Sequence, residues 1–207
     1  MSYPLWQEIS FYLNEIDQEK ATFEKQGFNP DALEKMRKKI SDFFDELKGS
    51  LEQKLDHNHA SLILFALVAA IDEEMQRFDY NHPKVKWSPL QKDFQGSYTG
   101  GEVFFTTIDH ILDNPKIPSI VCEVFYFMLK RGFQGKYRES KTQLMKYADL
   151  LKQKIPVNTP SAKAVPSEAS PLRAKQTKIT KGNYYTLAFV LFLVTTAGLY
   201  FLSNWEM

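Results

Sequence analysis

Apolar side chains recur at steps of three and four along residues 3–155, which is the repeat expected of α-helices that each bury one face. No stretch in this range alternates apolar and polar side chains over the length of a β-strand. The pattern therefore predicts an all-α domain made of about seven or eight helices.

Glycine, asparagine and proline mark the expected helix ends. Asn29 and Pro30 suit the cap and the first position of the second helix, and Gly49 is expected to bend or break that helix. Gly132 is expected to end a later helix in the left-handed conformation, with Phe133 folded back onto the last turn.

Two segments are apolar on nearly all sides, residues 60–71 and 118–131. Both are too short to cross a bilayer, which takes about 20 residues, but they suit helices buried on every side. We expect them to lie side by side at the centre of the fold. Glu123 interrupts the second segment and must meet a hydrogen-bond donor or stay protonated, so we expect its role to be structural.

A longer uncharged stretch, residues 184–202, lies near the C-terminus. Its roughly 19 residues, at about 1.5 Å each, would cross most of a hydrocarbon core of about 30 Å. We therefore predict a single transmembrane helix whose side chains contact membrane lipid. Basic residues gather before this stretch, which places the preceding domain in the cytosol by the positive-inside rule; they are Arg173, Lys175, Lys178 and Lys181.

Residues 156–181 are rich in proline, serine, alanine and lysine and contain almost no large apolar side chain. Such a composition is typical of a flexible linker, and about 25 residues of coil have a mean reach of roughly 25–30 Å. The expected order is a cytosolic helical domain at 1–155, the linker at 156–182, the transmembrane helix at 183–203 and a short tail beyond the membrane at 204–207.

The charge balance limits the classes of partner. A formal net charge of +1 leaves no broad basic field to neutralise phosphates, so we expect no nucleic acid among the partners. The single cysteine, Cys122, excludes an intramolecular disulfide, and its apolar neighbours predict a buried thiol.

Candidate chemistry is sparse. Asp56, His57 and His59 are close in sequence, but their spacing fits no familiar helical metal-ligand pattern, and a solvated polar turn is favoured. Gly100-Gly101 precede a helix without the strand or the lysine of a phosphate-binding loop. We expect no catalytic residue, metal or cofactor, and a membrane-tethered metal-binding enzyme stands as the opposing hypothesis.

The strongest polar feature is an acidic run, Asp72-Glu73-Glu74, directly after the apolar segment 60–71. Neighbouring helical positions point about 100° apart, so these carboxylates do not converge as a general acid–base pair. A contact surface for a protein partner or a solvated helix end are the remaining interpretations. Under the first of these, Asp72→Lys together with Glu73→Lys is expected to weaken partner recovery without unfolding the domain.

Three stretches together resemble the DotU/IcmH/TssL family of bacterial secretion proteins: LFALVAAIDEEM at 64–75, WSPLQKDFQGSYTGGEVFF at 87–105 and CEVFYFMLKRGFQGKYR at 122–138. Beyond the acidic residues, the positions that carry the resemblance are Trp87, Leu90, Gly100, Gly101, Glu102, Glu123, Gly132, Phe133, Gly135 and Tyr137.

The resemblance implies a cytosolic domain of two packed helical bundles with a hook-like shape, anchored in the bacterial inner membrane with its C-terminus in the periplasm. It also implies a structural part in a type VI secretion membrane complex, or alternatively in a type IVB apparatus. The implied partners are an IcmF/TssM-like membrane protein, baseplate components and, as a further candidate, a second copy of the chain. The family's contact residues would correspond to Asp72 and Glu73.

Two departures from the family pattern accompany the resemblance. Many relatives continue into a peptidoglycan-binding domain, whereas this chain is expected to be a short form. Gln134 stands where an acidic residue is common in the Gly-Phe-x-Gly turn. A tail-anchored adaptor outside secretion is the third hypothesis.

Overall fold

The computed structural model describes residues 3–26, 29–81, 86–95 and 100–156. All regular structure within these ranges is helical, in agreement with the predicted all-α class. The elements are α1 (Tyr3–Lys25), α2 (Pro30–Lys54), α3 (His57–Asn81), α4 (Gln91–Gln95), α5 (Gly100–Asp113), α6 (Ser119–Arg131), the 3₁₀ helix η1 (Gly135–Tyr137) and α7 (Lys141–Lys154).

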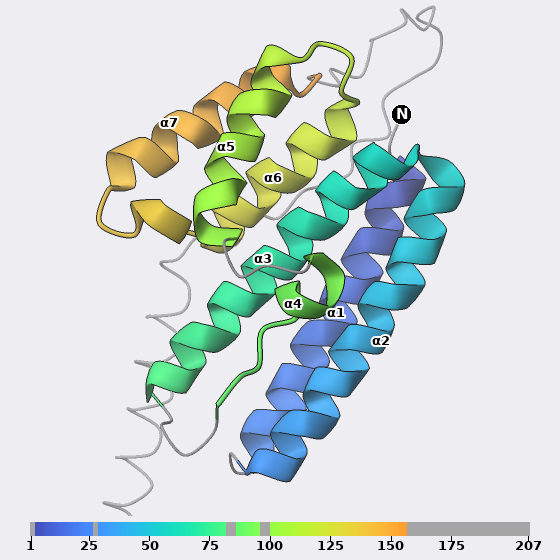
Figure 1. Ribbon diagram of the computed structural model, residues 1–207, viewed down its shortest axis with the longest axis vertical. Coiled ribbons are helices and arrows are strands. Elements are labelled where there is room, and N and C mark those ends of the chain that lie inside the picture. The colour runs from blue at the N-terminus through green and yellow to red at the C-terminus, as the bar shows by residue number, and fades with distance from the viewer. Residues whose placement is uncertain (1–2, 27–28, 82–85, 96–99, 157–207) are drawn as a thin grey trace, which may run out of the picture. The chain divides into compact units, whose positions relative to one another are not determined.

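Helix α3 lies at the centre of these elements (Figure 1). One side of α3 packs against α2, which in turn packs along α1, and the other side packs against α5 and α6. Helix α7 lies against α5 and α6. The predicted contact between the two most apolar segments is therefore confirmed as the packing of α3 on α6.

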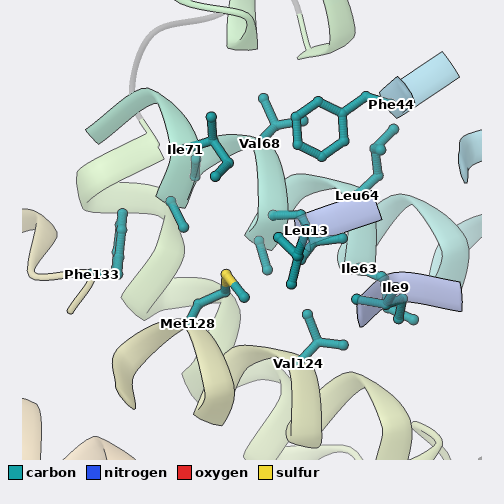
Figure 2. Packing of buried hydrophobic residues seen from close by; sticks show 14 of the residues in the cluster. Ile9, Leu13, Phe44, Ile63, Leu64, Val68, Ile71, Val124, Met128 and Phe133 are labelled. Carbon is teal, nitrogen blue, oxygen red and sulfur yellow. The ribbon is translucent and has the colours of Figure 1, made fainter. Parts of the chain in front are cut away.

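The hydrophobic core is continuous across this central helix. Figure 2 shows side chains from four helices meeting in one cluster, among them Leu13 of α1, Phe44 of α2, Val68 of α3 and Val124 of α6. Cys122 belongs to the same cluster and is 4% exposed, as predicted for a thiol among apolar residues. Burial raises the pKa of this thiol.

The start of α2 follows the predicted capping pattern. The Asn29 side chain accepts a hydrogen bond from the Ala32 N–H at 2.8 Å, and Pro30 occupies the first helical position. The prediction for Gly49 is wrong, because α2 continues through this residue to Lys54. A single exposed glycine costs a helix only about 1 kcal/mol, which the apolar face of α2 readily offsets.

Gly49→Ala is expected to raise the free energy of unfolding by about 0.5–1 kcal/mol, because alanine restricts the unfolded chain and favours the helix. A Cβ at this position meets no other atom within 4 Å, so no clash opposes the gain. Urea unfolding of the compact unit formed by residues 1–159 measures the change. An unchanged midpoint would show that α2 is not helical at Gly49 in solution.

The end of α6 also follows the prediction. Gly132 adopts φ = 108°, its N–H donates to the Leu129 carbonyl at 3.1 Å, and the Phe133 N–H donates to the Met128 carbonyl at 3.0 Å. The Phe133 ring then packs on Phe104, with 4.1 Å between ring centroids. This turn directs the chain back across the start of α5.

None of the described helices combines the length and the apolar character of a membrane span. The predicted span at residues 184–202 and most of the predicted linker lie outside the described residues.

Candidate functional site

Three consecutive carboxylates in the C-terminal half of α3 reach three different segments of the fold. The first, Asp72, is completely buried. Its Oδ1 accepts hydrogen bonds from the Trp87 Nε1–H and the Leu90 N–H, and its Oδ2 accepts one from the Gln91 N–H, all at 2.8 Å. Burial raises the pKa of Asp72, while these donors act against the rise. Asp72 thereby fixes the segment that leads into α4.

Glu73 holds the turn after α6. It is 7% exposed, and its two carboxylate oxygens accept hydrogen bonds from the Gln134 N–H at 3.0 Å and the Gly135 N–H at 2.6 Å. The Arg77 guanidinium lies 3.8 Å from the same carboxylate and donates to the Gly132 carbonyl at 3.1 Å. The chain from Gly132 to Gly135 is therefore attached to α3 at several points.

Glu74 joins α3 to α1 and α6 through charge. It pairs with Lys20 of α1, and Arg131 of α6 lies 3.6 Å from it. Arg131 also forms a bidentate ion pair with Asp17 of α1. Its Nη1 donates to Asp17 Oδ2 at 3.0 Å, and its Nη2 donates to Oδ1. Four charged groups from three helices thus form one network at the surface of the core.

This network should make stability depend on acidity. Partial burial opposes ionisation of Asp17, but hydrogen bonds and charge from Arg131 and Lys20 hold its pKa below the usual value. Because the pKa of Asp17 is lower in the folded than in the unfolded chain, its ionised form stabilises the fold, and this stabilisation is complete at pH values above the unfolded pKa of about 3.9. It is lost as the pH falls through the folded pKa.

Asp17→Asn should therefore flatten the loss of stability between about pH 5 and pH 2. The effect should stay below about 1 kcal/mol, since the Asp17 side chain is 43% exposed and screened by solvent. Urea unfolding of both proteins across this range measures it. Parallel pH profiles for the two proteins would exclude a stabilising network at Asp17.

The glycines of the two Gly-rich motifs approach one another beside Glu73. The Gly100 N–H donates to the Gln91 side-chain oxygen at 2.9 Å, which ties α5 to α4. Gly135 has φ = 48°, and a Cβ there would lie 2.6 Å from the Gly101 carbonyl oxygen. The backbones of η1 and α5 can approach this closely because Gly135 lacks a side chain, whereas a Cβ at Gly101 would make only an ordinary contact of 3.5 Å with Gly135.

A surface groove of about 390 Å³ lies over this contact. Its floor includes Gly101, Gly135 and Glu73, whereas its rim carries the exposed side chains of Glu102, Lys136 and Arg138. The groove thus presents charges of both signs above a floor fixed by hydrogen bonds to α3. Such a surface suits a polar peptide segment.

The family described as type VI secretion system protein DotU matches residues 21–206. This chain belongs to the DotU family. The resemblance seen in its motifs is confirmed, and the family is a component of a secretion system.

The DotU fold is also found in solved structures that resemble this chain. DotU from Francisella novicida is 24% identical, with a TM-score of 0.65 over 72% of this chain and 98% of its own. SciP/TssL from enteroaggregative Escherichia coli 042 is 17% identical, with a TM-score of 0.57 over 82% and 95%. The cytoplasmic domain of TssL from Acinetobacter baumannii is 23% identical, with a TM-score of 0.51 over 70% and 93%. Among curated proteins, none matches this chain.

Most of the DotU motif residues converge, although they are far apart in sequence. Trp87 and Leu90 bind Asp72, and the glycine pair at 100–101 meets the turn at 132–135. Tyr137 lies on the same side, with its ring centroid 4.6 Å from that of Phe105. The motifs therefore describe one structural junction around α3.

Glu123 lies away from this junction, between α6 and α1. Its carboxylate accepts a hydrogen bond from the Trp6 Nε1–H, which joins α6 to α1. The predicted need for a donor is confirmed.

The histidines of the predicted polar turn are placed apart from the junction as well. His57 lies 3.2 Å from Glu52, and His59 pairs with Asp56. No group of three or more potential metal ligands occurs in the part of the chain that the structure describes.

The residues Asp72, Glu73 and Glu74 do not form a shared exposed surface that a partner could contact. Asp72 and Glu73 are buried acceptors of hydrogen bonds, and Glu74 alone is partly exposed. The expectation that Asp72→Lys with Glu73→Lys leaves the domain folded therefore conflicts with this geometry, because two lysines would replace five accepted hydrogen bonds.

Several residues of the junction were not predicted, namely Gln91, Arg77, Asp17 and Arg131. One of their partners could have been found from the sequence: Lys20 interrupts the apolar face of α1, which indicates that its ammonium group meets a carboxylate where α1 packs on its neighbours. Gln91 offers no comparable pattern, because its role depends on where the chain returns at Gly100.

Proposed function

We propose that this DotU-family chain is a non-catalytic scaffold of a type VI secretion membrane complex. Its helical domain lies in the cytosol, and residues 184–202 hold it in the bacterial inner membrane. One observation carries the proposal: the family match extends from residue 21 to residue 206 and so includes most of the helical domain together with the apolar stretch. The family is described as a type VI secretion protein, which favours type VI over type IVB secretion.

The chemistry of the junction supports a scaffold. Asp72 and Glu73 are held by donated N–H groups from other segments, so both oxygens of each carboxylate are already engaged. A general base needs an oxygen within reach of a substrate proton. These groups instead keep the groove floor rigid, which favours recognition of a partner without rearrangement.

The groove is the candidate docking site for the proposed partners, an IcmF/TssM-like membrane protein and a baseplate component. The acidic run takes part through Glu73, which lines the groove. Exposed Lys136, Arg138 and Glu102, which line the groove, supply the charges that would select and orient a bound segment.

Membrane attachment is tested by comparing the full chain with a chain ending at residue 182. The full chain should remain in the membrane fraction after a carbonate wash, and the shortened chain should become soluble. Protease added to spheroplasts should leave the helical domain intact. A full chain extracted by carbonate, or a domain cleaved from outside, would contradict the anchored topology.

Partner docking is tested by co-purification from cells that make the secretion apparatus. Lys136→Glu with Arg138→Glu should lower recovery of the IcmF-like protein or of a baseplate component at least about fivefold, since rim charges act mainly through association. Lys38→Glu with Lys48→Glu makes the same charge change on the exposed side of α2 and should leave partner recovery unchanged. Equal recovery by both variants would exclude the groove, and recovery of type IVB proteins would overturn the type VI assignment.

A further inference from the structure

An aromatic patch lies on the outer side of the α1–α2 pair, away from the groove. Phe11 is 57% exposed, and its ring packs edge-on against Tyr12 with 5.4 Å between centroids. The Tyr12 ring is 6.2 Å from that of Phe43 on α2. Phenylalanine side chains are among the most often buried, so one that is more than half exposed beside two other rings calls for a partner.

Carboxylates surround this patch. Glu8 and Glu15 lie three and four residues from Phe11 on the same side of α1, and Asp42 and Glu46 lie one turn apart on the facing side of α2. The Tyr12 hydroxyl donates to Glu46 at 3.2 Å, which places that carboxylate directly beside the rings. Burial raises the pKa of Tyr12, and the charges of Glu46 and Glu8 raise it further.

The local charge is only partly neutralised. Lys54 pairs with Glu8, and Lys39 pairs with Glu19 further along the same seam. Among the described residues, none forms an ion pair with Glu15, Asp42 or Glu46. The patch therefore combines one exposed ring, Phe11, and the partly buried rings of Tyr12 and Phe43 with carboxylates that form no ion pair with any described residue.

We propose that this aromatic patch, formed by Phe11, Tyr12 and Phe43 with Glu15, Asp42 and Glu46 around it, binds a cationic segment of a protein partner through arginine side chains. An arginine guanidinium can stack on an aromatic ring and pair with a neighbouring carboxylate at the same time. Acidic and apolar side chains cannot make both contacts. A second copy of the chain would bring the same carboxylates together and be repelled. The patch is separate from the groove and widens the proposed scaffold to two docking surfaces.

The direct test uses the full chain in lipid nanodiscs and a fluorescent synthetic helix with two arginines four residues apart. Anisotropy should show binding, and Phe11→Ser should weaken it about fivefold, as should Glu15→Lys with Glu46→Lys. The controls make the same kinds of change at exposed positions elsewhere, Met145→Ser on α7 and Glu34→Lys with Glu139→Lys, and should stay within twofold. A peptide with glutamates in place of the arginines should not bind.

Equal affinity for the arginine and glutamate peptides, or equal losses in the patch variants and the controls, would overturn the proposal. In cells, a photo-reactive residue replacing Phe11 should cross-link to a segment containing arginine within one helical turn of the attachment point. Cross-linking to lipid, to a second copy or to an acidic segment would also overturn it. The peptide measurement requires no secretion apparatus, so its failure is distinguishable from failure of the proposed function.

Discussion

Asp72→Ala is expected to lower the free energy of unfolding of residues 1–159 by about 4 kcal/mol. The substitution removes the acceptor of three hydrogen bonds, from the Trp87 ring and from the Leu90 and Gln91 backbones, at a completely buried position. Each donor left unsatisfied costs about 1–3 kcal/mol, and water that enters the space recovers part of that loss. Urea unfolding followed by circular dichroism measures the difference.

Two companion variants make this result specific. Asp72→Asn keeps the volume but turns an amide donor toward an N–H group, so we expect it to recover less than half of the loss. Glu102→Ala removes an exposed carboxylate from the groove rim and should change stability by less than about 0.5 kcal/mol. If Asp72→Ala were no more destabilising than Glu102→Ala, the carboxylate would not hold the connector before α4.

Gly135→Val is expected to cost about 3 kcal/mol and to detach η1 from α5. Two effects add: the residue has φ = 48°, which a β-branched side chain rarely adopts, and a Cβ would lie 2.6 Å from the Gly101 carbonyl oxygen. The new Cβ and the Gly101 carbonyl oxygen are both fixed to the backbone, so the two backbones must separate to relieve the clash. The separation should also expose the Gly135 N–H, which Glu73 now accepts, to hydrogen exchange.

Gly132→Ala is the matched control for this effect. Gly132 also has a positive φ, of 108°, but a Cβ there meets nothing within 4 Å. In the control, the free energy of unfolding should fall by only about 1–2 kcal/mol, the cost of placing alanine at a positive φ. The Gly135 N–H should stay protected from exchange. Equal losses and equal exchange in the two variants would show that contact between η1 and α5 contributes nothing to stability.

The parts of the fold that depend on neighbouring residues could be predicted from the sequence. The cap at Asn29 and the turn at Gly132 each require a residue type at a fixed place in one helix end, and both are confirmed. The pairing of α3 with α6 followed from their nearly complete apolar character. The error at Gly49 came from treating a local propensity as decisive where the packing of a whole helix face outweighs it.

The partners of the acidic run could not be predicted, because they are distant in sequence. Asp72 binds groups 15 to 19 residues away, Glu73 binds groups 61 and 62 residues away, and Glu74 pairs with Lys20 at a separation of 54. Periodicity shows that three adjacent carboxylates point in different directions, but not what each one meets. An abrupt acidic run after an apolar helix fits a surface and a buried junction equally well until the topology is known.

The division of work between the groove's floor and its rim has a consequence for how this protein can change. The floor is held at Gly135, where a Cβ would clash, and at Glu73, whose carboxylate accepts backbone N–H groups, so both positions tolerate little substitution. Glu102, Lys136 and Arg138 are exposed and free to vary. Substitutions at the rim can therefore redirect recognition toward a new partner at almost no cost in folding. Two secretion systems in one cell could keep such scaffolds apart through a few rim charges on an identical frame.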